Sequence, residues 1–534
     1  MSARGSQSGG RSSEVERIIA AAEVDTTFAG KKARYRGRRS TWPGALALFL
    51  VAAGSVFGLV YYGIKLKNDV NDQVASDAAV RNIYSSGTAI SDGRPTVEVT
   101  DITITNPAKY TDNKCQQPNF VSKNGKILAV MADNTEVQID IKGVNWLGME
   151  NSKGVPEGLW DNTREGSTMY RVSQFLSNNN FNVVRLPLAV DSVMRNIDID
   201  ISLINTNSNR AFDSVTNYLK LLSLVVQGLG QSKIGVVLDF HVLSAFRAEE
   251  STGLWYGTAI QIADIKTAID NLATLLCNSQ HFNVMGIDLK DGLGLSATWG
   301  DGSDTDWAAA ATDLGNYMLT ACPSWLAFVQ GIQGSSHKDL YDDKEIKSRF
   351  PAGSDLSNVK AAPIKLATSN KVVYSPKYFS SSYLPYQYFF DSSVSKGDML
   401  EDYVESSDTK LRANVITNMG YMFGDTYETG AAVVLSTFGG LMGKSADLTP
   451  KLTSTRIVNV LIEQMLATEK SLAGGFWWTL NPDTYWSYPA PDNSNGTSQG
   501  LVDDTWRAAN MDVLNYLAKM DNMTHVSFIP CITS

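Results

Sequence analysis

Short apolar runs alternate with longer amphipathic stretches from residue 139 almost to the end of the chain. The short runs are typical of buried strands, and the longer stretches place apolar residues at the three- and four-residue spacing of a helix. Eight strands are predicted, at residues 139–146, 183–187, 235–241, 284–291, 325–332, 372–377, 432–437 and 475–481. Helices are predicted at residues 167–176, 212–226, 265–276, 307–321, 399–423, 453–472 and 505–518, with a weaker one near 359–364.

This regular alternation favours βα units around a parallel sheet. Eight such units fit an α/β fold of the (β/α)8 TIM barrel type, whose functional site lies at the C-terminal ends of the strands. Periodicity by itself also allows a doubly wound sheet. Upstream of the first unit, two alternating runs flank Asp133 and Asn134 and predict a hairpin between residues 120 and 141.

An uncharged run from Thr41 to Ile64 is long enough to span a bilayer as one helix. About forty residues precede the run, which does not fit a cleaved signal peptide. Basic residues favour the cytoplasmic side of a membrane. Six of them form one block before the run: Lys31, Lys32, Arg34, Arg36, Arg38 and Arg39. We therefore expect a single-pass type II protein with a signal-anchor helix, a cytoplasmic N-terminus and an extracellular or lumenal C-terminal part.

Four segments are predicted. Residues 1–41 form a disordered cytoplasmic tail, 42–64 the transmembrane helix, 65–112 a stalk, and 113–534 the barrel domain. Gly54 and Gly58 form a G-x-x-x-G pair, which would let two such helices approach, so a helix-mediated homodimer is one alternative.

The composition is that of a folded protein, with 43% hydrophobic and 19% charged residues in 534. The net charge is −9, and the one basic block lies beside the apolar run, so we expect a membrane partner and no nucleic acid. The cysteines lack C-x-x-C spacing and the four histidines are scattered, so we expect neither a metal nor a cofactor.

The four cysteines all follow the apolar run, in the compartment where disulfides are stable. Cys277 and Cys322 end the predicted helices before strands four and five, which are neighbours in a barrel. Cys115 and Cys531 belong to its first and last parts, which closure brings together. We predict these two pairs, with free thiols or other pairings as alternatives. Asn495 and Asn522 lie in N-glycosylation acceptor sequences.

Residues 281–300 read HFNVMGIDLKDGLGLSATWG, an apolar strand followed by a glycine-rich loop. This stretch resembles the fourth barrel strand of glycoside hydrolase family 5, in which an asparagine precedes the acid/base glutamate. Asp291 stands at the position of that asparagine and Gly292 at the position of the glutamate. Other segments similar to the family follow in the family's order, at residues 143–146, 158–160, 181–187, 239–241 and 476–482.

The resemblance implies a cellulase-like barrel in which Arg185, His241 and Trp478 line the sugar subsite at the scissile bond. Aromatic faces suit the C–H faces of pyranose rings. The predicted substrate-binding residues are Asn145, Trp146, Arg185, His241, Asp291, Trp299, Tyr374, Lys377 and Trp478. Loop tryptophans such as Trp255 and Trp486 favour a binding cleft as well.

The catalytic positions depart from the family's pattern. Thr437 replaces the nucleophilic glutamate on strand seven, and Gly292 replaces the acid/base. Retaining glycosidases need two carboxyl groups about 5 Å apart, so no catalytic residue is expected. Glu150, Asp291 and Asp483 are the nearest substitutes in sequence. Among them, Asp291 is expected to pair with Lys377 or Arg185.

The sequence is consistent with three functions. The first is a membrane-anchored, catalytically inactive barrel, a pseudoenzyme that binds β-glucan or a related β-linked polysaccharide at the cell surface. The second is an active endo-β-glucanase-like hydrolase of O-glycosyl bonds with unusual residues. The third is a protein-interaction module.

Overall fold

The computed structural model describes residues 43, 46–56, 58–65, 90–92, 99 and 101–531, except 163, 248–251, 335–336, 340–343, 347–348, 397–398, 443–452 and 483–498. The chain divides into two units, Met1–Gln73 and Val74–Ser534. In the first unit, the helix Leu46–Lys65 has a mean hydropathy of 1.9 and is by length and composition able to cross a membrane. The predicted tail with its basic block lies outside the described residues.

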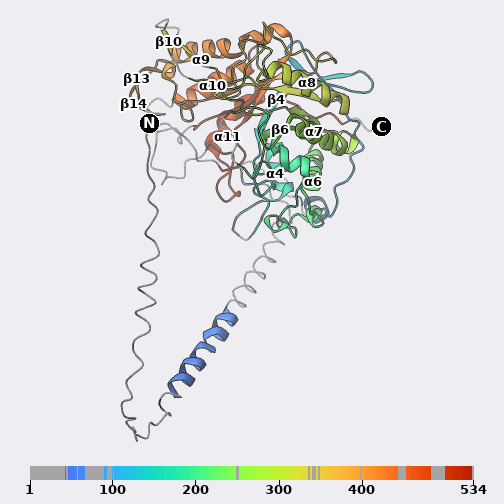
Figure 1. Cartoon of the computed structure of the whole chain (residues 1–534), viewed down its shortest axis with the longest axis vertical. Helices are drawn as coiled ribbons and strands as arrows, with labels where there is room; N and C mark the ends of the chain where they lie inside the picture. The colour runs from blue at the N-terminus through green and yellow to red at the C-terminus, as the bar shows by residue number, and fades with distance from the viewer. Residues whose placement is uncertain are drawn as a thin grey trace, which may run out of the picture. The chain divides into compact units, whose positions relative to one another are not determined.

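The second unit is built around one closed parallel sheet (Figure 1). Its strands follow chain order from β4 to β8. The bounds are β4 (Ile141–Asn145), β5 (Val183–Ala189), β6 (Gly235–Val242), β7 (Val284–Asp288), β8 (Leu326–Val329), β11 (Val372–Tyr374), β12 (Lys377–Phe379), β15 (Ala432–Val433), β16 (Leu435–Gly439) and β17 (Gly474–Trp477). The predicted barrel is therefore confirmed, and the doubly wound alternative is wrong.

The sixth and seventh barrel strands are each interrupted. β11 pairs with β15, and β12 pairs with β16, so both halves of the sixth strand lie beside the seventh and close the ring. The break in the sixth strand falls at Ser375 and Pro376, because proline has no N–H to donate to a neighbouring strand.

Helices cover the outside of the sheet (Figure 1). They are α4 (Met169–Asn178), α5 (Val190–Arg195), α6 (Tyr218–Gln231), α7 (Ile262–Leu276), α8 (Trp307–Ala321), α9 (Asp408–Phe423), α10 (Thr453–Met465) and α11 (Met511–Leu517). Side chains at the N-caps fix several of the starts. Thr168 accepts from the N–H of Arg171, and Asp306 accepts from the N–H of Ala309, so two otherwise unpaired helical donors are satisfied.

Two helix predictions were wrong. The range 399–423 begins as a strand, β14 (Met399–Glu405), which pairs with β13 (Phe390–Lys396). The helix starts only at Asp408, because the Ser407 side chain caps it. Residues 359–364 form turns rather than a helix.

Side chains along each strand point alternately into the barrel and toward the helices, so the protein has an inner and an outer core. Val183 and Val237 point into the barrel, whereas Val184 and Val236 pack outward against the helices. A three-stranded antiparallel sheet packs on the inner core through Phe120. It consists of β1 (Asn119–Lys123), β2 (Lys126–Val130) and β3 (Glu136–Gln138). The predicted hairpin is β2–β3, and β1 was not predicted.

Folded contacts extend upstream of residue 113, into the segment predicted as a stalk. Ser91 forms a parallel bridge with Ala508. Asp92 accepts a hydrogen bond of 2.8 Å from Asn179 and is almost completely buried. A short helix, α3 (Ile102–Thr105), follows, with Asp101 at its N-cap.

Both predicted disulfides are confirmed. Cys277 and Cys322 are the C-cap residues of α7 and α8, and their Cα atoms are 5.9 Å apart. Cys115, before β1, is bonded to Cys531 near the end of the chain, with a Cα–Cα distance of 4.8 Å. Closure of the barrel brings these distant segments together, so the second bond ties the tail to the sheet below the barrel.

The two disulfides span very different lengths of chain, 416 residues for Cys115–Cys531 and 45 for Cys277–Cys322. By loop entropy alone they stabilise by about 6 and about 4 kcal/mol respectively. We expect Cys115→Ser/Cys531→Ser to lower the free energy of unfolding more than Cys277→Ser/Cys322→Ser, measured by guanidinium denaturation. A larger loss from the second pair would contradict this loop-entropy ranking.

Candidate functional site

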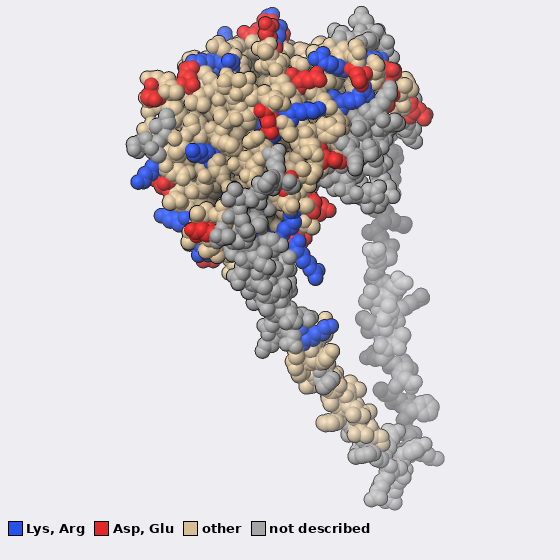
Figure 2. Space-filling model, turned by 180° about the vertical axis from the view of Figure 1, so that it is seen from behind, with Lys and Arg blue, Asp and Glu red and all other residues tan. Residues whose placement is uncertain are grey.

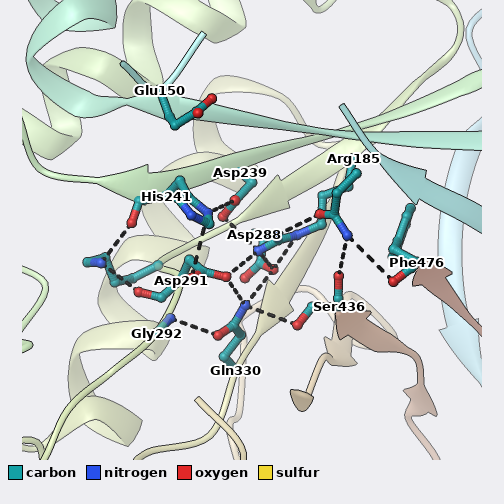
Figure 3. A network of polar contacts seen from close by, with 12 residues as sticks. Glu150, Arg185, Asp239, His241, Asp288, Asp291, Gly292, Gln330, Ser436 and Phe476 are labelled. Carbon is teal, nitrogen blue, oxygen red and sulfur yellow. Dashed lines mark hydrogen bonds and ion pairs between the residues drawn. The ribbon is translucent and has the colours of Figure 1, made fainter. Parts of the chain in front are cut away.

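Arg185 on β5 is the centre of a buried cluster of acids at the C-terminal ends of the strands (Figure 3). Its Nη2 atom lies 2.8 Å from Asp239 Oδ1 on β6 and 2.8 Å from Asp288 Oδ2 on β7. The same atom lies 2.9 Å from Asp291 Oδ1. Nη1 donates to Asn145 Oδ1 at 3.0 Å. One guanidinium therefore joins the ends of four neighbouring strands.

The charges of this cluster depend on one another. Burial alone would lower the pKa of Arg185, but Asp239, Asp288 and Asp291 outweigh that effect and raise it. Burial raises the pKa of Asp288 to about 7, against the lowering effect of Arg185. A neutral Asp288 is thus accessible near neutral pH, while Arg185 keeps its charge.

Asp291 is held from several sides. Lys377 Nζ on β12 lies 2.5 Å from Asp291 Oδ2, and Gln330 Nε2 donates to Oδ1 at 2.8 Å. Burial alone would raise the pKa of Asp291, but Lys377, His241 and Arg185 together hold it well below its usual range. The carboxylate is therefore ionised, and it pairs with both cations that the sequence offered as its partners.

His241 connects the acids to the aromatic part of the site. Its Nδ1 atom lies 2.8 Å from Asp239 Oδ2 and 3.6 Å from Asp291 Oδ2. Its ring is nearly parallel to the half-buried Trp478, at 16° and 6.0 Å between centroids. Burial would lower the pKa of His241, but the charges of Asp291 and Asp239 outweigh the effect of burial and raise this pKa.

Glu150, in the loop after β4, lies on the other side of His241 (Figure 3). Burial raises the pKa of this carboxyl, against the lowering effect of His241. Its Oε2 accepts a hydrogen bond of 2.7 Å from the N–H of Gly148. Glu150 and Asp291 thus have pKa values displaced in opposite directions.

Gly292 and Thr437 stand at the ends of the fourth and seventh barrel strands. Gly292 has a φ of +65°, and its N–H donates to Gln330 Oε1 at 2.9 Å. A Cβ added at this glycine would meet only Lys377 Nζ, at 3.6 Å. Thr437 is buried and lies opposite Lys377 in the strand register. Open space and an ammonium group therefore adjoin Gly292.

Asp239, His241 and Asp291 offer three ligand atoms within 4.8 Å of one another, close enough in principle to hold a metal ion. Arg185 and Lys377 already contact these carboxylates. These two side-chain cations lie beside the same oxygen atoms and would repel a metal ion, so the three residues do not fit a metal site.

The predicted binding residues divide into two groups. The structure brings together Asn145, Arg185, His241, Asp291, Lys377 and Trp478. Three others lie in the outer core between the strands and the helices: Trp146, Trp299 and Tyr374.

The structure places these three predicted residues in the outer layer and not beside the Arg185 cluster. Because successive side chains on a strand point to opposite faces, the inward position of Asn145 places Trp146 outside. Trp146 Nε1 donates to Glu157 O, and Trp299 Nε1 donates to Ala362 O. Tyr374 follows the inward Val373, and its hydroxyl accepts from the outer layer. The indole of Trp255 is also buried in the core. Trp486 and Asp483 lie outside the described residues.

The sequence assignment missed Asp239, Asp288 and Gln330. Asp239 is two residues before His241, on the same face of β6, so strand periodicity could have found it. Asp288 ends β7. Gln330 gives hydrogen bonds to Asp288 and Asp291 and accepts one from Gly292. Its role depends on neighbouring strand ends, which sequence spacing does not show.

Comparison with known proteins gives the family. Residues 135–484 match the model of cellulase, glycosyl hydrolase family 5. The chain belongs to glycosyl hydrolase family 5. An endoglucanase of Paenibacillus polymyxa is 25% identical over 400 residues, covering 73% of this family 5 chain and 85% of the relative. The major extracellular endoglucanase of Xanthomonas campestris pv. campestris is 25% identical over 391 residues, covering 72% and 69%.

Solved structures agree on the fold. The hyperthermophilic endocellulase of the archaeon Pyrococcus horikoshii is 24% identical, with a TM-score of 0.60 over 76% of this family 5 chain and 99% of the endocellulase. The catalytic domain of the Xanthomonas campestris endoglucanase is 22% identical, with a TM-score of 0.58 over 75% and 99%.

Lys377 helps to keep Asp291 ionised, and this has a consequence for acid stability. A depressed carboxyl pKa contributes stability that is present above the unfolded-state pKa and is lost as pH falls through the folded value. We expect Lys377→Met to raise the pKa of Asp291 and move the acid-unfolding midpoint to higher pH, followed by circular dichroism. Lys360→Met is the control, because Lys360 pairs with Glu428 at the exposed surface. Equal midpoints for the two variants would contradict the assignment.

Proposed function

We propose that this family 5 protein is a membrane-anchored, catalytically silent barrel that binds a β-linked polysaccharide such as β-glucan. One observation carries the proposal: Asp291 is bound by Lys377 and Arg185, while Gly292 and Thr437 supply no carboxyl group at the strand ends beside it. The positions match those of the family's two catalytic glutamates in the resemblance drawn from the sequence.

Retaining hydrolysis needs one carboxyl group that attacks the anomeric carbon and another, about 5 Å away, that protonates the leaving oxygen. Asp291 is a poor acid because it is ionised, with its pKa held low by Lys377, His241 and Arg185 against the effect of burial. It is also a poor nucleophile, because its oxygen atoms are engaged by Lys377, Arg185 and Gln330. Both arguments favour binding without turnover.

The sugar-binding part of the site supports the choice of ligand. The parallel pair His241–Trp478 offers a flat aromatic surface, and both side chains are partly exposed. A variant of the Pyrococcus horikoshii endocellulase, 25% identical to this chain, was solved in complex with cellotetraose. A β-linked glucan is therefore the ligand class that we assign to this barrel.

A second candidate is an active hydrolase in which Glu150 acts as the acid and Asp291 as the nucleophile. Pairs of carboxyl groups whose environments push their pKa values apart are typical of acid and nucleophile assignments. Burial raises the pKa of Glu150, whereas Asp291 is held ionised. This arrangement would replace the family's two glutamates with Glu150, from the loop after β4, and with Asp291, the residue before Gly292.

The anchor is part of the proposal. The helix Leu46–Lys65 has the length and hydropathy to cross a membrane. The basic block between Lys31 and Arg39 would keep the N-terminus in the cytoplasm. The barrel would then be extracellular or lumenal, with Asn522 at its surface and open to glycosylation. Gly54 and Gly58 would allow two such helices to pair.

Binding and turnover are measured on the full chain in detergent micelles. We expect saturable binding of cellotetraose by calorimetry and no release of reducing ends from soluble β-glucan. Trp478→Ala should weaken binding roughly tenfold, because an aromatic face contributes on the order of 1 kcal/mol beyond its buried area. Tyr421→Ala, at an exposed aromatic residue on α9, is the matched control and should bind as the wild type does.

Turnover that survives purification and disappears in both Asp291→Asn and Glu150→Gln would replace the proposal with the second candidate. If cellotetraose and longer β-glucans fail to bind to a protein whose folding is verified by circular dichroism, neither function holds.

Topology is tested in sealed microsomes that contain the full chain. We expect added protease to remove the segment before Thr41 and to spare the barrel, because the basic block favours the cytosolic side. Digestion of the barrel without detergent would reverse the assigned orientation.

A further inference from the structure

A side chain at position 292 would begin in open space, because Gly292 has no Cβ. A Cβ built there has one neighbour within 4 Å, the ammonium nitrogen of Lys377 at 3.6 Å. The site therefore presents a cation beside an unfilled volume. A ligand group that enters this volume meets a positive charge first.

Lys377 keeps capacity for a further acceptor. An ammonium group has three N–H donors. Among the described residues, its acceptor is Asp291 Oδ2, at 2.5 Å. The side chain is 13% exposed, so the remaining donors are available to a ligand that reaches the open space.

The charges around this space leave a positive excess once Asp288 is protonated. The acids are Asp239, Asp288 and Asp291, and the cations that contact them or lie among them are Arg185, Lys377, His241 and Lys290. Glu150, on the other side of His241, is a fourth acid, so four cations face four carboxylates when every group is charged. Protonation of Asp288, whose pKa burial raises to about 7, leaves one positive charge in excess. Protonation of Glu150, whose pKa burial also raises, adds a second.

This excess is local to the site. On the face of the molecule seen in Figure 2, basic and acidic residues are interspersed among neutral ones, and the whole chain carries a net charge of −9. Positive groups beside open space in an acidic protein attract anionic groups more strongly than their surroundings do.

We propose that the sugar bound over Gly292 is a uronic acid, whose carboxylate enters the open space and pairs with Lys377. The inference rests on the proposed function, because it names the ligand of the same site. The ligand's carboxylate takes the volume that a side-chain carboxyl group at position 292 would occupy. Lys377 is already paired with Asp291, so a neutral pyranose would offer its remaining donors neutral acceptors only, whereas hydrogen bonds to an ionised acceptor are stronger.

The test titrates the full chain in detergent micelles with three tetrasaccharides of one backbone. The first is cellotetraose, the second is the same oligomer oxidised to uronic acid at C6, and the third is the same oligomer sulfated at C6. We expect the uronate to bind at least tenfold more tightly than cellotetraose at low salt. The preference should shrink as ionic strength rises, because salt screens partly exposed charges.

Two variants test whether the preference for the uronate arises at Gly292 and Lys377. Lys377→Met should bring the ratio of the two dissociation constants close to one. Gly292→Ala fills the start of the open space without adding charge and should lower the ratio as well. Gly302→Ala is the matched control, because Gly302 also has a positive φ, +72°, with no atom near its added Cβ, and is exposed further along the same connection between β7 and α8. The control should keep the wild-type ratio.

The outcomes separate the inference from the function on which it rests. Equal affinity for cellotetraose and its uronate would overturn the inference while the proposed glycan binding stands. Preference for the sulfated oligomer over the uronate would also overturn it, as would a preference that survives Lys377→Met in a protein of unchanged melting temperature. Failure of all three oligomers to bind would remove the proposed function as well.

Discussion

The arrangement of the site depends on one buried charge, the guanidinium of Arg185. Three carboxylates lie within 2.9 Å of its Nη2 atom, and these acids come from the ends of adjacent strands. Removing Arg185 would leave several buried negative charges close together, which is strongly unfavourable. The cation therefore holds acids from β6, β7 and the loop after β7 against β5.

A second cation changes what this network can do. Lys377 pairs with Asp291 Oδ2, while Gln330 and Arg185 donate to Oδ1. The acid is consequently a structural partner and a weak candidate for proton transfer. Chemistry at such a site needs a carboxyl group that can change its charge, and Glu150 and Asp288 have pKa values raised by burial. Asp288 contacts Arg185 directly, which leaves Glu150 as the more accessible of the two.

The proposed sugar-binding surface is distinct from the charged strand ends. It consists of the stacked rings of Trp478 and His241. The space beside Gly292 adjoins an ammonium group. Binding and bond cleavage depend on different side chains, so the first can persist when the second is lost. Under the proposed binding of a uronic acid, ligand charge is the property that the site selects.

Sequence pattern predicted the eight alternating units, the resemblance to family 5 chose the barrel over a doubly wound sheet, and the places of the cysteines favoured both disulfides. Strands and helices have different periods of apolar residues, so their ranges can be recognised in the sequence. Successive units of a closed barrel are neighbours, and this allowed Cys277 and Cys322 to be paired from their positions at the ends of two successive helices. Motif order located Arg185, His241 and Trp478. Only the tertiary structure decided the rest. Whether Trp146 and Tyr374 face the ring or the helices depends on strand register, which a one-residue shift reverses. Asp239, Asp288 and Gln330 come from three neighbouring strands or strand ends, and the barrel brings them into contact with the same charged groups. The strength of the electrostatic interaction between them depends on interatomic distances, which only the folded chain determines.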